Sequence, residues 1–203
     1  MIPWTDSIRQ SGKLTINMAS LAGSWAHVFR QALHDFNRLC TAHRLGVQII
    51  ESKRSAEDKD GANISVQTAD GGVSASYDNM SKSEDFDGSR LHGMTLLFWR
   101  DPERVLEKAY IFLPSQPKVS TPQRLRAAGP GVMKVIAAHE LLHACGLENA
   151  EHSRDDLFQG NPRVNAGDTA AGDKILIGVG PKEMPELYLG GGTAKNVKDL
   201  WTK

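Results

Sequence analysis

Two histidines four residues apart restrict the fold of this 203-residue chain more than any other feature. His139 and His143 enclose Glu140 in the pattern His-Glu-x-x-His, and Gly146 follows three residues after the second histidine. Residues four apart on an α-helix lie one turn above each other, so both imidazoles project from one face and can share a metal ion. The chain must therefore contain a helix that turns this face towards a cleft, and Gly146 permits a sharp turn where the helix ends.

The pattern also predicts a chemistry. Zinc lowers the pKa of a bound water to about 7, and it stabilises the oxyanion that forms when hydroxide attacks a carbonyl. Glu140 stands beside the two histidines, where it can accept the proton of that water. We therefore expect Zn²⁺ as the cofactor, His139 and His143 as two of its ligands, and Glu140 as the general base of a hydrolase.

Composition indicates one soluble globular domain over residues 1–203, with 40% hydrophobic and 24% charged residues. The 24 Lys and Arg residues balance the 24 Asp and Glu residues, which argues against nucleic acid or an anionic membrane as a partner. The first residues lack the pattern of a signal peptide, and no apolar stretch is long enough to cross a membrane. We expect a cytoplasmic protein, or one released without a classical signal, for example as part of a virion.

The order of predicted elements is typical of an α+β fold. Alternating apolar residues predict strands at 13–18, 47–50, 63–67, 73–77, 93–99 and 108–113. Helices are predicted from an N-cap at Ser20 to about Leu45, from about Pro130 to Gly146, and over 193–201, whereas 77–90 and 151–183 are predicted to be loops. These elements predict one twisted mixed sheet, backed by a long helix and the histidine-bearing helix, and a short C-terminal helix.

The histidine motif with Gly146, a later histidine and a downstream methionine resembles the metzincin clan of zinc peptidases, especially its compact matrixin-like members. The resemblance implies a zinc endopeptidase acting on peptides or proteins, with subdomains of about 1–146 and 147–203. It implies that Met184 forms a methionine turn beneath the metal. It also implies that the strand at 93–99 lines the cleft and pairs with an extended substrate.

The sequence departs from the clan pattern at the third ligand. The clan places His or Asp three residues after the glycine, but this chain has Asn149 there, and the nearest histidine is His152. Asparagine is a poor zinc ligand beside imidazole, so we expect an insertion of one turn with His152 as the third ligand. Asp155 and Asp156 are further alternatives.

Two other functions fit the same residues. A zinc-stabilised structural or binding module within a larger assembly would keep the metal without turnover, although a purely structural site is usually closed by four protein ligands. A gluzincin-like peptidase would take its third ligand from a downstream carboxylate, Glu183 or Glu186. Gly146 in its metzincin position favours the metzincin interpretation over the gluzincin-like one.

Overall fold

The computed structural model describes residues 1–55, 61–86, 93–120, 125–152, 164–166, 173–176, 181–183 and 186–202. The helices are α1 (Asp6–Ser11), α2 (Trp25–Ala42), α3 (Pro130–Ala144), the 3₁₀ helix η1 (Asn149–Glu151) and α4 (Gly191–Trp201). The strands are β1 (Lys13–Ser20), β2 (Gln48–Glu51), β3 (Ile64–Ala69), β4 (Gly71–Tyr77), β5 (Met80–Phe86), β6 (Met94–Arg100), β7 (Val105–Pro114), β8 (Lys118–Ser120), β9 (Leu125–Ala127), β10 (Val164–Ala166), β11 (Asp173–Leu176) and β12 (Pro181–Glu183).

Five strands form the central sheet, in the order β2-β1-β3-β7-β6. The first four run parallel, and β6 pairs antiparallel with β7 at one edge. Helix α2 connects the parallel neighbours β1 and β2, as a parallel crossover requires. The prediction of an α+β fold with a mixed sheet and two long helices is confirmed, and most of the central sheet is parallel. The prediction of a single sheet was wrong, because the strand predicted at 73–77 is β4, which pairs with β5 in a separate two-stranded sheet.

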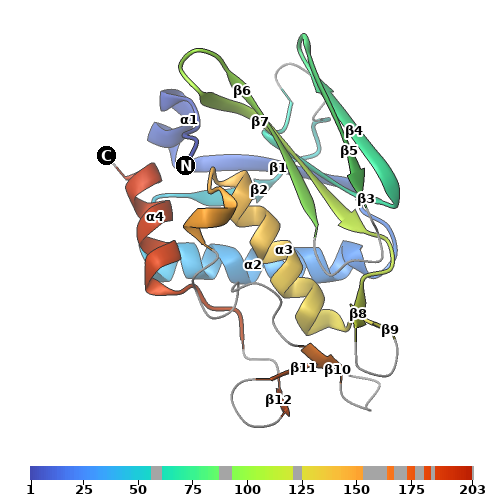
Figure 1. The fold of residues 1–203 in the computed structure, drawn as a ribbon. Coiled ribbons are helices and arrows are strands. Elements are labelled where there is room, and N and C mark those ends of the chain that lie inside the picture. Colours follow the sequence, from blue (N-terminus) through green and yellow to red (C-terminus); the bar gives the residue numbers. More distant parts are fainter. Residues whose placement is uncertain are drawn as a thin grey trace.

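Strand β7 shows how the sheet separates two apolar cores. Ala109, Ile111 and Leu113 belong to the main core, which lies between the sheet and helices α2 and α3 (Figure 1). Tyr110 and Phe112 alternate with them and face a smaller core, which is covered by the β4–β5 hairpin. Alternation with a period of two puts successive side chains on opposite faces of a strand. The hairpin and the two helices therefore cover opposite faces of the sheet.

Helix α3 is apolar on nearly every side, as expected for a helix packed inside the main core. Pro130 occupies its first turn, where a missing N–H costs nothing. At its other end two indoles satisfy backbone carbonyls: Trp4 Nε1 donates to the Ala144 oxygen at 2.8 Å, and Trp201 Nε1 donates to that of Cys145 at 3.0 Å. Residues from both ends of the described chain thus hold the end of α3 that precedes Gly146.

The predicted bounds of the first helix were wrong at both ends. Ser20 is the last residue of β1, and the chain turns through Gly23, whose φ is 58°, before α2 begins at Trp25. The helix ends at Ala42 because Arg44 adopts the left-handed conformation, with a φ of 53°. Helix α1 lies in the polar N-terminal segment, for which the sequence pattern predicts neither helix nor strand.

The expected loop over 77–90 was also wrong in part, because Met80–Phe86 forms strand β5, while residues 87–90 lie outside the described residues. The strand pairs along its whole length with β4 through a tight turn in which Asp78 has a φ of 52°. Most of its side chains are polar because one face of the hairpin is in water, so pairing rather than composition determines this strand.

The expected loop over 151–183 was wrong in part, because β10, β11 and β12 form a small antiparallel sheet within it. Each of these strands has only three or four residues, too few to show a clear alternation of apolar side chains. Among the helices of the described residues, none has the length and apolar character needed to cross a bilayer.

Candidate metal centre

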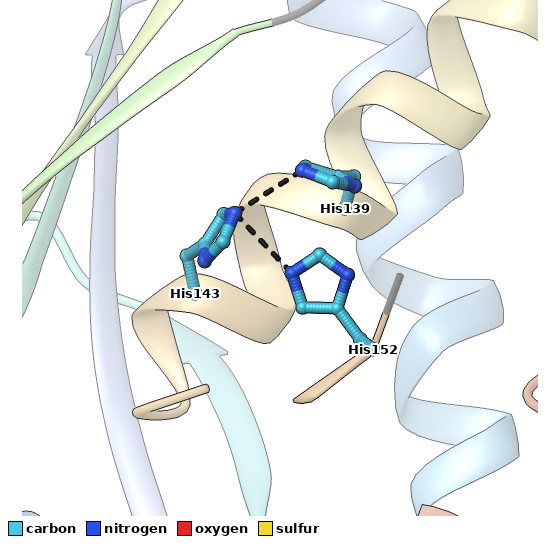
Figure 2. A group of neighbouring side chains, drawn as sticks. All are labelled: His139, His143 and His152. Carbon is cyan, nitrogen blue, oxygen red and sulfur yellow. Dashed lines mark hydrogen bonds between the residues drawn. The ribbon is translucent and has the colours of Figure 1, made fainter. Parts of the chain in front are cut away.

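Helix α3 presents His139 and His143 on one face, one turn apart. Their Nε2 atoms lie 3.1 Å apart, and the ring centroids are separated by 4.8 Å (Figure 2). Both side chains are half-buried, whereas the residues around them on the helix are mostly buried. The spacing of the motif therefore gives the shared face that the sequence predicted.

A tight turn after α3 brings the third histidine back to this face. Gly146 has a φ of 104°, a conformation that L side chains rarely adopt. The short helix η1 follows, and His152, which is 1% exposed, comes directly after it. Its Nε2 atom lies 3.3 Å from Nε2 of His143 (Figure 2). Possible ligand atoms of the three histidines all lie within 4.8 Å of one another.

The other predicted ligands that the structure describes are not in this cluster. Asn149 is exposed at the first position of η1. Glu186 is also exposed and lies 3.9 Å from Arg38, with which it forms an ion pair. Met184, Asp155 and Asp156 lie outside the described residues, as does the side chain of Glu183. Among the described residues, the group able to hold a metal consists of three histidines.

Two of the three separations between the imidazole nitrogens suit ligands of one tetrahedral metal ion. Zinc binds imidazole nitrogen at about 2.0–2.1 Å, so two such nitrogens around one ion are about 3.3 Å apart. The Nε2 separations of 3.1 Å (His143–His139) and 3.3 Å (His143–His152) agree with this value, and possible ligand atoms of all three histidines lie within 4.8 Å of one another. Three neutral imidazoles can satisfy a divalent cation while a fourth position stays available for water or substrate.

The proton on His143 can be assigned from its second nitrogen. Nδ1 lies 2.8 Å from the carbonyl oxygen of Leu147, and a carbonyl can only accept a hydrogen bond. Nδ1 therefore carries the proton in the neutral ring, and Nε2 holds the lone pair that faces the other histidines. Metal-binding histidines commonly donate their second ring N–H to such an oxygen.

Glu140 lies on the same helix, and its side chain is buried, with 2% of the residue exposed. Thr95 of β6 donates a hydrogen bond from Oγ1 to Oε2 of Glu140 at 2.6 Å. Burial raises the pKa of the Glu140 carboxyl above its ordinary value, while the electrostatic interaction with His143 and the hydrogen bond from Thr95 act in the opposite direction. The carboxyl group is thus largely removed from water, and its position depends on protein contacts.

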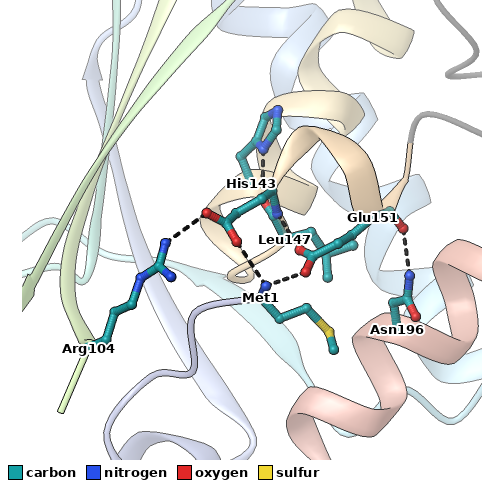
Figure 3. Close-up of polar contacts among 7 residues, drawn as sticks. Met1, Arg104, His143, Leu147, Glu151 and Asn196 are labelled. Carbon is teal, nitrogen blue, oxygen red and sulfur yellow. Dashed lines mark hydrogen bonds and ion pairs between the residues drawn. The ribbon is translucent and has the colours of Figure 1, made fainter.

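Polar contacts hold the segment between Gly146 and His152 (Figure 3). The amino group of Met1 forms ion pairs with Glu148 and Glu151, and Arg104 Nη2 lies 3.0 Å from Oε1 of Glu148. Glu148 and Glu151 also form a capping box around η1. From α4, Asn196 Nδ2 donates to the Glu151 carbonyl at 2.7 Å. The segment that carries the third histidine is therefore held by Arg104 in the β6–β7 turn, by Asn196 on α4 and by the amino group of Met1.

Strand β6 has a neighbour on only one side among the described strands. Ala109, opposite Leu97 on β7, donates its N–H to Asn63 at 3.1 Å, on the side away from β6. Leu97 and, two residues earlier, Thr95 therefore direct their own backbone groups to the edge that faces away from β7. At Leu97 this edge is covered, because Lys82 Nζ donates to the Leu97 carbonyl at 2.7 Å.

Sequence reasoning missed Thr95 and Lys82, and no local signal marks either residue. It also missed the capping pair Glu148 and Glu151, although acidic residues at these two positions of a helix start are a recognisable pattern. No protein-family model and no curated protein matches this sequence. The geometry of the site is therefore the basis on which a function can be inferred.

Proposed function

We propose that this chain is a zinc-dependent endopeptidase of metzincin type, with a longer spacing to the third ligand. The observation that carries the proposal is the cluster of His139, His143 and His152, whose possible ligand atoms lie within 4.8 Å of one another. The first two stand on α3, the helix that also bears the buried Glu140. Three protein ligands are typical of catalytic zinc sites, in which a fourth position binds water or substrate.

The donor set favours zinc over harder cations. Magnesium and calcium prefer oxygen ligands, whereas imidazole suits zinc and the later transition metals. When bound, zinc supplies Lewis acidity that polarises a carbonyl and lowers the pKa of water. In this proposal His143 keeps its Nε2 lone pair directed at the metal because Nδ1 donates to the Leu147 carbonyl.

Glu140 is the proposed general base. Its carboxylate takes a proton from the attacking water, holds it on one oxygen, and passes it to the nitrogen of the leaving amine. Burial of this group excludes bulk water from the carboxylate and strengthens its interaction with nearby charge. Burying a carboxylate is costly, and a buried carboxylate that interacts with a neighbouring imidazole, as Glu140 does with His143, is a feature of functional sites.

The edge of β6 that faces away from β7 is the proposed substrate-binding site. An extended peptide can add to such an edge through main-chain hydrogen bonds. Thr95 offers its backbone groups there and contacts Glu140 through its side chain, so a peptide paired at Thr95 would lie next to the general base. The covered carbonyl of Leu97 limits how far such pairing extends along β6.

The proposal is tested with a quenched-fluorescence peptide library and the zinc-loaded protein. We expect hydrolysis that a chelator abolishes and added zinc restores. A protein that binds one zinc ion per chain and cleaves none of the peptides would contradict the proposal. That outcome would favour the structural or binding module instead.

A further inference from the structure

The edge strand β6 contributes more than backbone groups to the site. We infer that Thr95 is a positioning residue, whose hydroxyl fixes the carboxylate of Glu140 in the orientation that the proposed general base requires. The inference rests on the proposed function for its catalytic consequence, whereas the contact itself can be tested without turnover.

The first support is the hydrogen bond itself. Thr95 Oγ1 lies 2.6 Å from Oε2 of Glu140, a distance typical of a strong bond between a hydroxyl and a carboxylate. An ionised carboxylate can only accept, so the hydroxyl is the donor. The bond engages Oε2 and leaves the other oxygen, Oε1, to receive a proton. Its direction therefore determines which oxygen of Glu140 is available for chemistry.

The second support is independent of the hydroxyl and comes from Gly93, two residues before Thr95 and so on the same face of the chain. A Cβ atom at Gly93 would lie 2.6 Å from Cγ and 3.0 Å from Cδ of Glu140. It would also lie 2.9 Å from the carbonyl oxygen of Phe112, which cannot move without disturbing β7. The missing side chain thus provides the space that the Glu140 side chain occupies.

Together the two residues confine the carboxylate. Gly93 supplies the room and Thr95 supplies the donor, and both belong to the segment whose edge is proposed to bind substrate. A general base must lie within hydrogen-bond reach of the proton it removes, so a small rotation of its side chain reduces the rate. A peptide seated on β6 would consequently share one rigid strand with the group that orients the base.

The contact is tested with a double-mutant cycle on the full chain, measured with and without zinc. Thr95→Val keeps the shape of the side chain and removes the hydroxyl. We expect it to change the unfolding equilibrium constant about tenfold when Glu140 is present, the size expected for a hydrogen bond to a charged group. In the Glu140→Ala background the change should be less than about twofold. Equal changes in both backgrounds would overturn the inference.

Catalysis is tested with the same variants on a peptide that the wild-type protein cleaves. Thr95→Val should lower kcat about tenfold or more, with zinc content and KM unchanged, and Thr95→Ser should restore most of the rate because it keeps the hydroxyl. Wild-type kcat in Thr95→Val would overturn the positioning role even if the cycle shows coupling. An inactive wild-type protein would count against the proposed peptidase, while the cycle would still decide whether Thr95 holds Glu140.

Discussion

His143 Nδ1 lies 2.8 Å from the carbonyl oxygen of Leu147, four residues further along the chain. This contact joins the second histidine of the motif to the turn that leads to the third one. It fixes the ring proton on Nδ1, so the Nε2 lone pair faces His139 and His152. The same short segment therefore orients one proposed ligand and delivers another.

Replacing His152 by Ala should weaken zinc binding by more than about 100-fold, since even changes behind a metal ligand commonly cost 10–100-fold in affinity. Asn149→Ala is the matched control, because Asn149 is exposed and lies outside the histidine cluster. Competition with a chromophoric chelator measures both affinities. Strong zinc loss in Asn149→Ala, with retention in His152→Ala, would reassign the third ligand.

Gly146→Ala should be strongly destabilising. An added Cβ would lie 2.2 Å from the carbonyl oxygen of Ile2 and 2.8 Å from Cδ2 of Leu200, at a backbone φ of 104°. We expect a loss of about 3 kcal/mol or more in the free energy of unfolding, together with weaker zinc binding.

Gly71→Ala is the control for that experiment. Gly71 also has a positive φ, 81°, but nothing lies within 4 Å of an added Cβ. Gly71→Ala should lower the free energy of unfolding by only about 1–2 kcal/mol, which is the contribution of the left-handed backbone alone. Denaturant unfolding gives both values, and equal losses at the two glycines would show that the contact with Ile2 is unimportant.

Low pH should weaken the ion pairs that hold the segment carrying His152. The pKa of Glu148 is lowered from its ordinary value of 4.5, mainly by the hydrogen bond from the amino group of Met1. Burial acts in the opposite direction and raises the pKa, whereas the positive charges of that amino group and of Arg104 lower it further. Because the folded-state pKa is lower than the unfolded one, the stabilisation is complete above the unfolded value and is lost as pH falls through the folded one.

Glu148→Gln should therefore flatten the pH dependence of stability below about pH 4.5. The effect should be small, because the Glu148 side chain is 44% exposed, and it should shrink further in high salt. Thermal unfolding from pH 3 to pH 7 checks this. Superimposable curves for the two proteins would contradict the role given to Glu148.

Lys82 should limit the length of peptide that pairs with β6. Its Nζ atom donates to the Leu97 carbonyl and lies 3.8 Å from the ring centroid of Trp99, which holds it across the edge. Lys82→Met should lower KM several-fold for peptides long enough to reach Leu97 and leave short peptides unchanged. Lys195→Met, an exposed change on α4, is the control. Equal effects on short and long peptides would show that Lys82 does not limit the length of peptide that pairs with β6.

Helical geometry explains why part of the site could be predicted from the sequence. The shared face of His139 and His143 follows from a spacing of four residues, and the preference of zinc for imidazole over an amide favours His152 over Asn149. The apolar character of 130–146 likewise indicates a helix, and α3 ends at Ala144. These are local properties, which a sequence carries directly.

Contacts across the sheet could not be predicted in this way. Thr95 and Glu140 are 45 residues apart and meet only because β6 lies at the edge next to α3. Strand β5 was missed because its pairing with β4, rather than its own polar side chains, makes it a strand. The start of α2 was misplaced because β1 continues to Ser20 and leaves that residue unable to cap a helix.

The central claim is tested most directly by turnover per bound zinc ion in wild-type protein and in Glu140→Ala, with the metal content of each sample measured. We predict one zinc ion per chain in both proteins, peptide hydrolysis by the wild type, and a rate lower by a factor of at least about 100 in the variant. A zinc-loaded Glu140→Ala protein that cleaves peptide at the wild-type rate would contradict the claim.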